Sequence, residues 1–185
     1  WSNFQTTQTI SGLYPGTYCV TVTDANGAVA TNCFSITQPT LLLIDIQKTN
    51  VRCGGKCTGK ASATPTGGWG GYTYLWNNGQ TTSNIANLCA ATYTVTVSDA
   101  SGCVKVISFN ITQNPVLSLI AAPSGPSSAT ASAGGGVAPY AYQWNTVPIQ
   151  YTATATGLSA GSTYKVRVTD AKGCIQRDTI VLNSS

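Results

Sequence analysis

The sequence contains no His, no Met and no Glu, and few charged residues of any kind. Charged residues make up 8% of its 185 residues, against about 25% in ordinary soluble domains. The five acidic residues are all Asp and are spread along the chain, so the positioned His or carboxylate pair of acid–base catalysis is missing. A Ser or Thr nucleophile would lack a base. The sequence therefore predicts no enzyme, no catalytic residues and no cofactor.

Long apolar runs are missing too. The longest aliphatic stretch, residues 41–44, is far shorter than the ~20 residues of a membrane helix, so no membrane insertion is expected. Without a Met, the sequence is expected to be a processed chain or part of a longer one. The net charge of +4 is too dilute for nucleic-acid binding, which usually shows a dense Lys/Arg stripe.

Seven cysteines are present, but with no His and few acids they disfavour a metal site. The rest of the sequence is rich in Thr, Val, Tyr, Ser and Gly, which is typical of strands and turns. In such a chain, the cysteines favour disulfides in an oxidising, extracellular compartment.

One pattern occurs three times, running from a Leu through a Tyr to an Asp-Ala-x-Gly turn. The glycine that ends it recurs after 75 and then 71 residues, at Gly27, Gly102 and Gly173. This period predicts complete repeats at 40–114 and 115–185, preceded at 1–39 by the C-terminal part of an earlier repeat. One Asp per turn offers too few oxygen ligands for calcium, so the turn Asp residues are interpreted as turn caps.

A Trp precedes each copy of the pattern, at Trp1, Trp76 and Trp144. In the first two copies the Tyr follows the Leu by five residues, the spacing of a tyrosine corner, and the third copy has one extra residue. These landmarks predict an all-β fold of tandem immunoglobulin-like β-sandwich repeats, each of 70–75 residues.

The motifs resemble the SprB-type repeat of bacterial gliding-motility surface adhesins, over essentially the whole chain. They are the segments Gly135–Trp144, Asn77–Thr82, Leu13–Tyr18 and Val168–Cys174. The resemblance implies an adhesive segment of a large cell-surface protein, exported by type IX secretion and associated with the gliding machinery. It also implies neighbouring repeats and a surface polysaccharide or substratum as partners. Two alternatives are a carbohydrate-binding or spacer module of a large secreted enzyme, and a subunit of an assembled extracellular fibre.

The cysteine positions suggest disulfides within repeats. Cys19 and Cys33 lie symmetrically about a hairpin turn, which predicts a cross-strand bond. In the second repeat, the loop with Cys53 and Cys57 and the turn with Cys103 are expected at one end of the sandwich. Cys53–Cys103 with Cys57–Cys89 is the first choice. The rivals are Cys53–Cys57 with Cys89–Cys103, and Cys57–Cys103 with Cys53–Cys89. Cys174 is expected to be an unpaired, buried thiol or to pair outside this sequence.

Other candidate sites lie where the copies differ. Trp69, in a glycine-flanked loop, is expected to contact the neighbouring repeat, with sugar stacking as the alternative. Lys165, Arg167 and Lys172 are candidates for binding acidic glycans, against the alternative of a solvated face. Asn110 matches the N-glycosylation pattern and Thr179 resembles a bacterial O-glycosylation acceptor.

Overall fold

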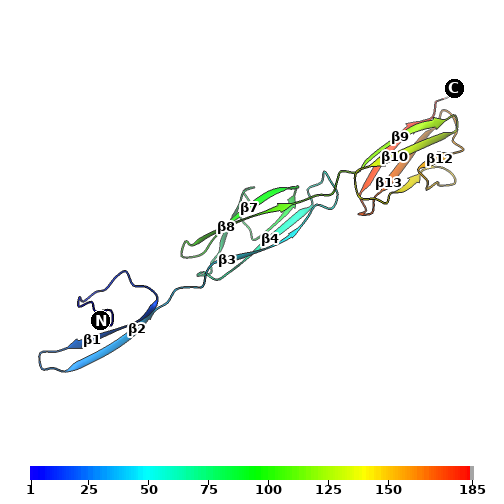
Figure 1. Cartoon of the computed structure of the whole chain (residues 1–185). Helices are drawn as coiled ribbons and strands as arrows, with labels where there is room; N and C mark the ends of the chain where they lie inside the picture. The colour runs from blue at the N-terminus through cyan, green and yellow to red at the C-terminus, as the bar shows by residue number, and fades with distance from the viewer. Residues whose placement is uncertain (184–185) are drawn as a thin grey trace.

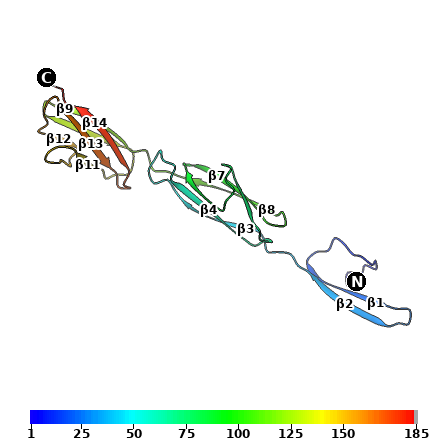
Figure 2. The same cartoon turned by 180° about the vertical axis from the view of Figure 1, so that it is seen from behind.

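Strands make up about half of the described residues, because β-branched and aromatic residues alternate with polar ones between Gly-containing turns. The computed structural model describes residues 1–183, which form fourteen strands and no helix. The strands form three units that follow one another along a line, as Figures 1 and 2 show from opposite sides. Accordingly, no helix in residues 1–183 is long and apolar enough to cross a membrane.

The first unit is a hairpin of β1 (Gly16–Thr23) and β2 (Val29–Ile36), preceded by irregular chain. Its turn points away from the rest of the molecule (Figure 1). The ring of Phe34 meets the edge of Trp1 at a centroid distance of 5.8 Å and stacks on Tyr18 at 6.1 Å. The hairpin thus carries its own small aromatic cluster.

The second unit is a sandwich of two three-stranded antiparallel sheets. One sheet has the order β3-β4-β6 and the other the order β5-β7-β8. The strands are β3 (Leu43–Thr49), β4 (Gly59–Thr66), β5 (Thr73–Trp76), β6 (Asn84–Leu88), β7 (Ala91–Ser98) and β8 (Val104–Ile111).

The third unit repeats this topology, with sheets in the orders β9-β10-β12 and β11-β13-β14. Its strands are β9 (Ser118–Gly125), β10 (Ser128–Gly134), β11 (Ala141–Trp144), β12 (Thr154–Thr156), β13 (Thr163–Thr169) and β14 (Ile175–Val181). In both units the first, second and fourth strands face the third, fifth and sixth. This is the strand arrangement of an immunoglobulin-like sandwich that lacks strand D, the edge strand of the sheet A-B-E-D.

Each sandwich has its own core between its sheets. Along β7, Tyr93, Val95 and Val97 are buried and alternate with half-buried polar residues, as a period of two requires. The buried cluster of the second unit draws only on residues within 51–111, with Trp76 on β5 1% exposed. The third unit is built the same way around Trp144, which is 0% exposed. Since its core is self-contained, the second unit is expected to fold by itself.

The same polar contacts fix the Trp in all three units. Each indole N–H donates to the carbonyl of a Thr that follows it, at 2.8 Å for Trp1–Thr7, 2.8 Å for Trp76–Thr82 and 3.1 Å for Trp144–Thr152.

The tyrosine corner is present as well. Tyr18 and Tyr93 donate their hydroxyls to the carbonyls of Tyr14 and Cys89, at 3.0 and 3.2 Å. In the third unit, which has one extra residue, the hydroxyl of Tyr164 instead accepts from the N–H of Ser159 at 2.8 Å. The prediction of an all-β, immunoglobulin-like fold is confirmed.

Candidate functional site: the repeat junction and the exposed sheet faces

The turn that closes the last hairpin of each unit is held by its Asp. Asp99 Oδ1 accepts the N–H groups of Ser101 and Cys103, both at 2.9 Å, and Asp170 Oδ1 accepts those of Lys172 and Cys174, both at 2.8 Å. Asp24 binds the corresponding turn of the first hairpin in the same way. The interpretation of these residues as turn caps is confirmed.

Two of these carboxyl groups are also tied to a neighbouring loop. Asp99 Oδ2 accepts the N–H of Trp69 at 3.0 Å, and Asp170 Oδ2 accepts that of Val137 at 3.0 Å. The hydrogen bond from the Ser101 hydroxyl is the largest cause that holds the pKa of Asp99 below its ordinary value, and the bond from the N–H of Trp69 is the second. These bonds fasten the turn to the loop at the same end of the sandwich.

The environment of Asp170 contains opposing influences. Burial alone would raise the pKa of Asp170, but backbone N–H donors, led by that of Cys174, together with the charge of Arg52 lower it overall. Arg52 belongs to the second unit, so the electrostatics of this turn depend on the repeat before it.

Two disulfides agree with the sequence prediction. Cys19 and Cys33 face each other across β1 and β2 and are bonded, with their Cα atoms 4.0 Å apart. Cys57 is bonded to Cys89 within the second unit, with a Cα separation of 3.9 Å. Each bond closes a loop inside one unit and stabilises that unit against unfolding.

The predicted bond between Cys53 and Cys103 is wrong, because these residues lie at opposite ends of the sandwich. The loop 50–58 joins β3 to β4, and Gly59 at the start of β4 pairs with Leu88 at the end of β6. The loop therefore sits beside the β6–β7 turn. The β7–β8 turn that carries Cys103 lies at the other end, which faces the first unit (Figure 1).

Cys53 instead bonds to Cys174 of the third unit, with the Cα atoms 5.6 Å apart. The expectation that Cys174 is unpaired is also wrong, although the residue is buried, at 7% exposure. The physical reason is that loop 50–58 lies at the end of the second unit that meets the β13–β14 turn of the third. In residues 1–183, the cysteine left without a disulfide is the exposed Cys103.

Hydrogen bonds shape the junction around this disulfide. The N–H of Val51 donates to the carbonyl of Thr112 at 2.8 Å, and the N–H of Gly55 donates to Gln113 Oε1 at 3.0 Å. Asn114 Nδ2 donates to the carbonyl of Arg52 at 2.8 Å. The loop is thereby fastened along the segment that leads into the third unit.

Close packing completes the junction. A Cβ on Gly54 would approach the N of Val116 to 2.7 Å and the carbonyl carbon of Pro115 to 2.8 Å, so only Gly fits against the linker. Cys53 itself packs with Leu117 and Cys174 in an apolar cluster of the third unit. The second and third units thus share a covalent and packed interface.

Sequence reasoning missed this bond, although a signal was present. Cys103 and Cys174 both follow the Asp-x-x-Gly turn, so the two residues occupy equivalent positions. In the first unit Ala28 stands at that position. The loop and the turn of one sandwich lie at opposite ends, so equivalent cysteines there point to bonds between repeats.

Trp69 lies beside the β7–β8 turn, at the end of the second unit that faces the first (Figure 1). Its loop is bound to that turn by a hydrogen bond from the N–H of Ala100 to the carbonyl of Gly70, at 2.8 Å. The side chain of Trp69 is 59% exposed. Its assignment to an inter-repeat contact or to sugar stacking stays a prediction.

The two candidate glycosylation residues are exposed on edge strands. Asn110 lies on β8, and its Oδ1 accepts the hydroxyl of Thr92 at 2.8 Å. Thr179 lies on β14, directly opposite Lys165 of β13. Both assignments stay predictions.

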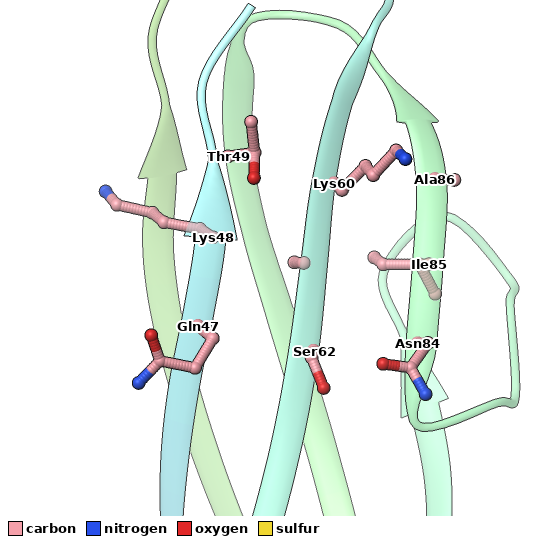
Figure 3. Close-up of a pocket in the computed structure, with 9 residues that line it drawn as sticks. Gln47, Lys48, Thr49, Lys60, Ser62, Asn84, Ile85 and Ala86 are labelled. Carbon is pink, nitrogen blue, oxygen red and sulfur yellow. The ribbon is translucent and has the colours of Figure 1, made fainter.

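A shallow groove of about 460 Å³ covers the outer face of β3, β4 and β6. Apart from Ile85, its lining side chains are small or polar, with Ser62 and Asn84 on neighbouring strands and Lys48 and Lys60 extending toward opposite sides (Figure 3). The groove has no aromatic lining residue. It offers hydrogen-bonding groups without a platform for stacking.

The outer face of β13 and β14 is basic. Arg167 lies directly opposite Arg177 in the strand register, and Lys165 is two residues along the same strand. All three are exposed and line a groove of about 360 Å³. Like charges placed opposite each other destabilise a sheet, so this pair is unfavourable without a counter-charge.

The equivalent positions in the other units are neutral. Thr96 and Val106 replace the arginine pair in the second unit, and Thr21 and Thr31 replace it in the first, where their hydroxyls are 3.1 Å apart. The basic face thus distinguishes the third unit. Lys172, named with it from the sequence, instead lines a groove at the junction with Arg52. In residues 1–183, no cluster of His, Cys, Asp or Glu could hold a metal ion.

Comparison with known families identifies part of the chain. Residues 46–81 match the family model for the SprB repeat. The resemblance to the SprB repeat is confirmed. The match runs from β3 to just beyond β5, within the second unit. Comparison with curated proteins found no similar sequence.

Among solved structures, the chain is similar to an amphioxus IgVJ-C2 molecule, at 12% sequence identity. The alignment covers 75% of this chain and 96% of that chain, with a TM-score of 0.28. This TM-score is too low to assign a fold, and the immunoglobulin-like assignment rests on strand order and packing.

The SprB repeat and the all-β sandwiches point to an adhesin-like surface segment and to a structural, non-catalytic module. Three disulfides suggest an extracellular protein, because such bonds persist in oxidising compartments.

Proposed function

We propose that the chain is a rod-like segment of a large cell-surface adhesin that mediates surface attachment during gliding motility. In this proposal it is exported by type IX secretion and consists of SprB-like repeats at 40–114 and 115–185 and part of another at 1–39. Its role is mechanical rather than catalytic, since the recurring Asp, Trp and Tyr residues hold turns and cores. The observation that carries the proposal is the covalent junction between the second and third units.

The junction supports a stiff connection for a physical reason. A short polar linker between independent domains behaves as a flexible joint. Here the linker residues Thr112, Gln113 and Asn114 are bound by the loop of the preceding unit, and the disulfide joins the two units directly. Bending would therefore require breaking the hydrogen bonds around Cys53–Cys174.

Small-angle X-ray scattering of the chain tests this stiffness. The native chain is expected to give one extended shape, and Cys53→Ser with Cys174→Ser a broader distribution of shorter dimensions. The matched control is Cys19→Ser with Cys33→Ser, which removes a disulfide from the first hairpin and leaves the junction intact. A scattering profile unchanged by loss of Cys53–Cys174 would argue against a rod held by this bond.

We further propose that the basic face of β13 and β14 is the adhesive contact of this segment, with an acidic surface polysaccharide as its partner. The supporting observation is the exposed pair Arg167–Arg177, whose mutual repulsion a polyanion would relieve. Carboxylate or sulfate groups repeated along a chain would satisfy both guanidinium groups and Lys165 together.

The test uses the residues that the second unit has at the same positions. Arg167→Thr with Arg177→Val is expected to weaken binding to polygalacturonate at least about tenfold, equivalent to about 1.4 kcal/mol, and to reduce its salt dependence. A control with Lys48→Thr and Lys60→Ser removes the same charge from the groove of Figure 3. If the control lost binding and the arginine variant kept it, the adhesive face would be the groove on β3, β4 and β6.

A further inference from the structure

Cys103 is a thiol without a disulfide partner, in a position whose equivalent is bonded across a repeat junction. It is exposed and lies one residue before β8. Cys174 lies one residue before β14 and is bonded to Cys53 of the preceding unit. The second and third units therefore share this cysteine position. They differ in that a complete sandwich precedes the third unit and only a hairpin precedes the second.

The two turns hold their cysteines in the same way. The Oδ1 of Asp99 accepts the N–H of Cys103 at 2.9 Å, and the Oδ1 of Asp170 accepts the N–H of Cys174 at 2.8 Å. In both turns the Gly before the cysteine has a positive φ, 85° at Gly102 and 78° at Gly173. Cys103 is thus presented toward the first unit as Cys174 is presented toward the second.

The partner cysteine, Cys53 in the bond to Cys174, is positioned by the docking of loop 50–58. That loop is bound by Thr112 and Gln113, which follow β8, and the docking brings Cys53 to the third unit. Thr37 and Gln38 follow β2 in the same way, after an Ile that is also shared. The end of the first unit therefore carries the Thr and the Gln that position such a loop, while Pro39 stands where Asn114 binds the carbonyl of Arg52.

The second unit has the turn that presents the cysteine, and the first unit ends in the Thr and Gln that bind the partner loop. We therefore propose that Cys103 forms a second inter-repeat disulfide. Its partner is a cysteine in the loop between the first two strands of a complete SprB-like repeat placed directly N-terminal to the second unit, as Cys53 is placed for Cys174. This inference rests on the proposed tandem array. In this arrangement the β7–β8 and β13–β14 turns each carry a cysteine that forms a disulfide with the preceding repeat.

The bond forms by two exchanges with a small-molecule disulfide such as oxidised glutathione. The Cys103 thiol loses its proton, and the resulting thiolate attacks that disulfide, forms a mixed disulfide and releases one glutathione thiolate. The thiolate of the partner cysteine then attacks the Cys103 sulfur and releases the second. Two cysteine thiols are oxidised, one glutathione disulfide is reduced to two thiols, and the two protons go to solvent or to the released thiolates.

The test supplies a complete repeat in the proposed position. Residues 1–38 are replaced by a second copy of residues 40–113 in which Cys103 is changed to Ser, so that only the original Cys103 remains. The copy is joined to Pro39, which preserves the Ile-Thr-Gln join because both segments end in it. The second unit has its own core and internal disulfide, so the added copy is expected to fold. The protein is refolded in a glutathione redox buffer and mapped by mass spectrometry of non-reduced peptides.

The expected result is a peptide pair joining Cys53 of the added copy to Cys103 of the original second unit, beside Cys57–Cys89 in both copies. Alkylation without denaturant is then expected to leave the original Cys103 unmodified. Changing only the added copy's Cys53 to Ser is expected to make it react fully. The inference is overturned if Cys57–Cys89 forms in both copies while the original Cys103 is alkylated or pairs elsewhere.

Scattering and peptide mapping distinguish loss of the second disulfide from loss of the rod-like shape. A tandem chain that gives an extended scattering profile while its Cys103 stays reduced would overturn the second disulfide and leave the rod intact. A chain that forms the bond but bends freely would support the disulfide and contradict the rod.

Discussion

Removal of the disulfide inside the second unit gives a quantitative test of how that unit is stabilised. Cys57 and Cys89 are separated by 32 residues and both are exposed. Replacing both with Ser therefore leaves no buried hydroxyl. In the loop-entropy description, a closure of this length contributes about 3.7 kcal/mol to the free energy of unfolding.

That loss is large for a unit of this size. Small domains have unfolding free energies at the low end of roughly 5–15 kcal/mol, so the double variant is expected to unfold in little urea. With a slope of about 1–1.5 kcal/mol per molar urea, the midpoint of the second unit should fall by roughly 2.5–3.7 M. The third unit, which contains neither residue, should keep its midpoint apart from any effect carried through the junction.

Pulsed hydrogen exchange along a urea titration resolves the two units. Peptides from β7 report the second unit and peptides from β13 report the third. Cys19→Ser with Cys33→Ser serves as the control, because it removes one disulfide from the first unit only. A loss of less than about 1 kcal/mol in the β7 peptides would show that Cys57–Cys89 contributes little, since the loop would then be constrained by the fold without the bond.

Three further changes test the turn, the corner and the junction. Asp99 has a lowered pKa when folded, so its contribution to stability is present above about pH 4, the unfolded value, and is lost as the pH falls through the folded value. Asp99→Asn should therefore flatten the decline in melting temperature between about pH 5 and pH 2, and an unchanged decline would contradict this role of the carboxylate. Tyr93→Phe leaves the Cys89 carbonyl without its 3.2 Å donor and should cost about 1 kcal/mol in urea unfolding; an unchanged midpoint would contradict a structural role for the corner. Gly54→Ala pushes a Cβ into the linker and should lower the yield of Cys53–Cys174 on refolding, measured by peptide mapping, with full yield as the contrary result.

Much of the fold was predictable because the same local rules recur in each repeat. The β7 alternation predicts a strand with one buried face, and the Asp-Ala-x-Gly sequence predicts a capped turn with a positive φ at Gly102. The Trp before each pattern predicts a core position on the third strand, where Trp76 and Trp144 are buried. These features depend on residues near one another in sequence.

The junction was not predictable in the same way, because it depends on which ends of neighbouring sandwiches meet. Cys19–Cys33 follows from hairpin symmetry alone. To predict the partner of Cys53, one must know that its loop and the β7–β8 turn lie at opposite ends of the sandwich. One must also know that the turn of the next repeat lies opposite this loop. The basic face was only partly visible, since Arg177 joins Arg167 through strand register rather than through sequence proximity.

The covalent coupling of successive repeats is tested most directly by mapping the disulfides of the native chain. The chain is alkylated under denaturing conditions without reduction, digested, and analysed by mass spectrometry. The expected peptide pairs are Cys19–Cys33, Cys57–Cys89 and Cys53–Cys174, with alkylated Cys103. A pair joining Cys53 to Cys103, together with alkylated Cys174, would contradict it, because the second and third units would then be linked only by the chain between them.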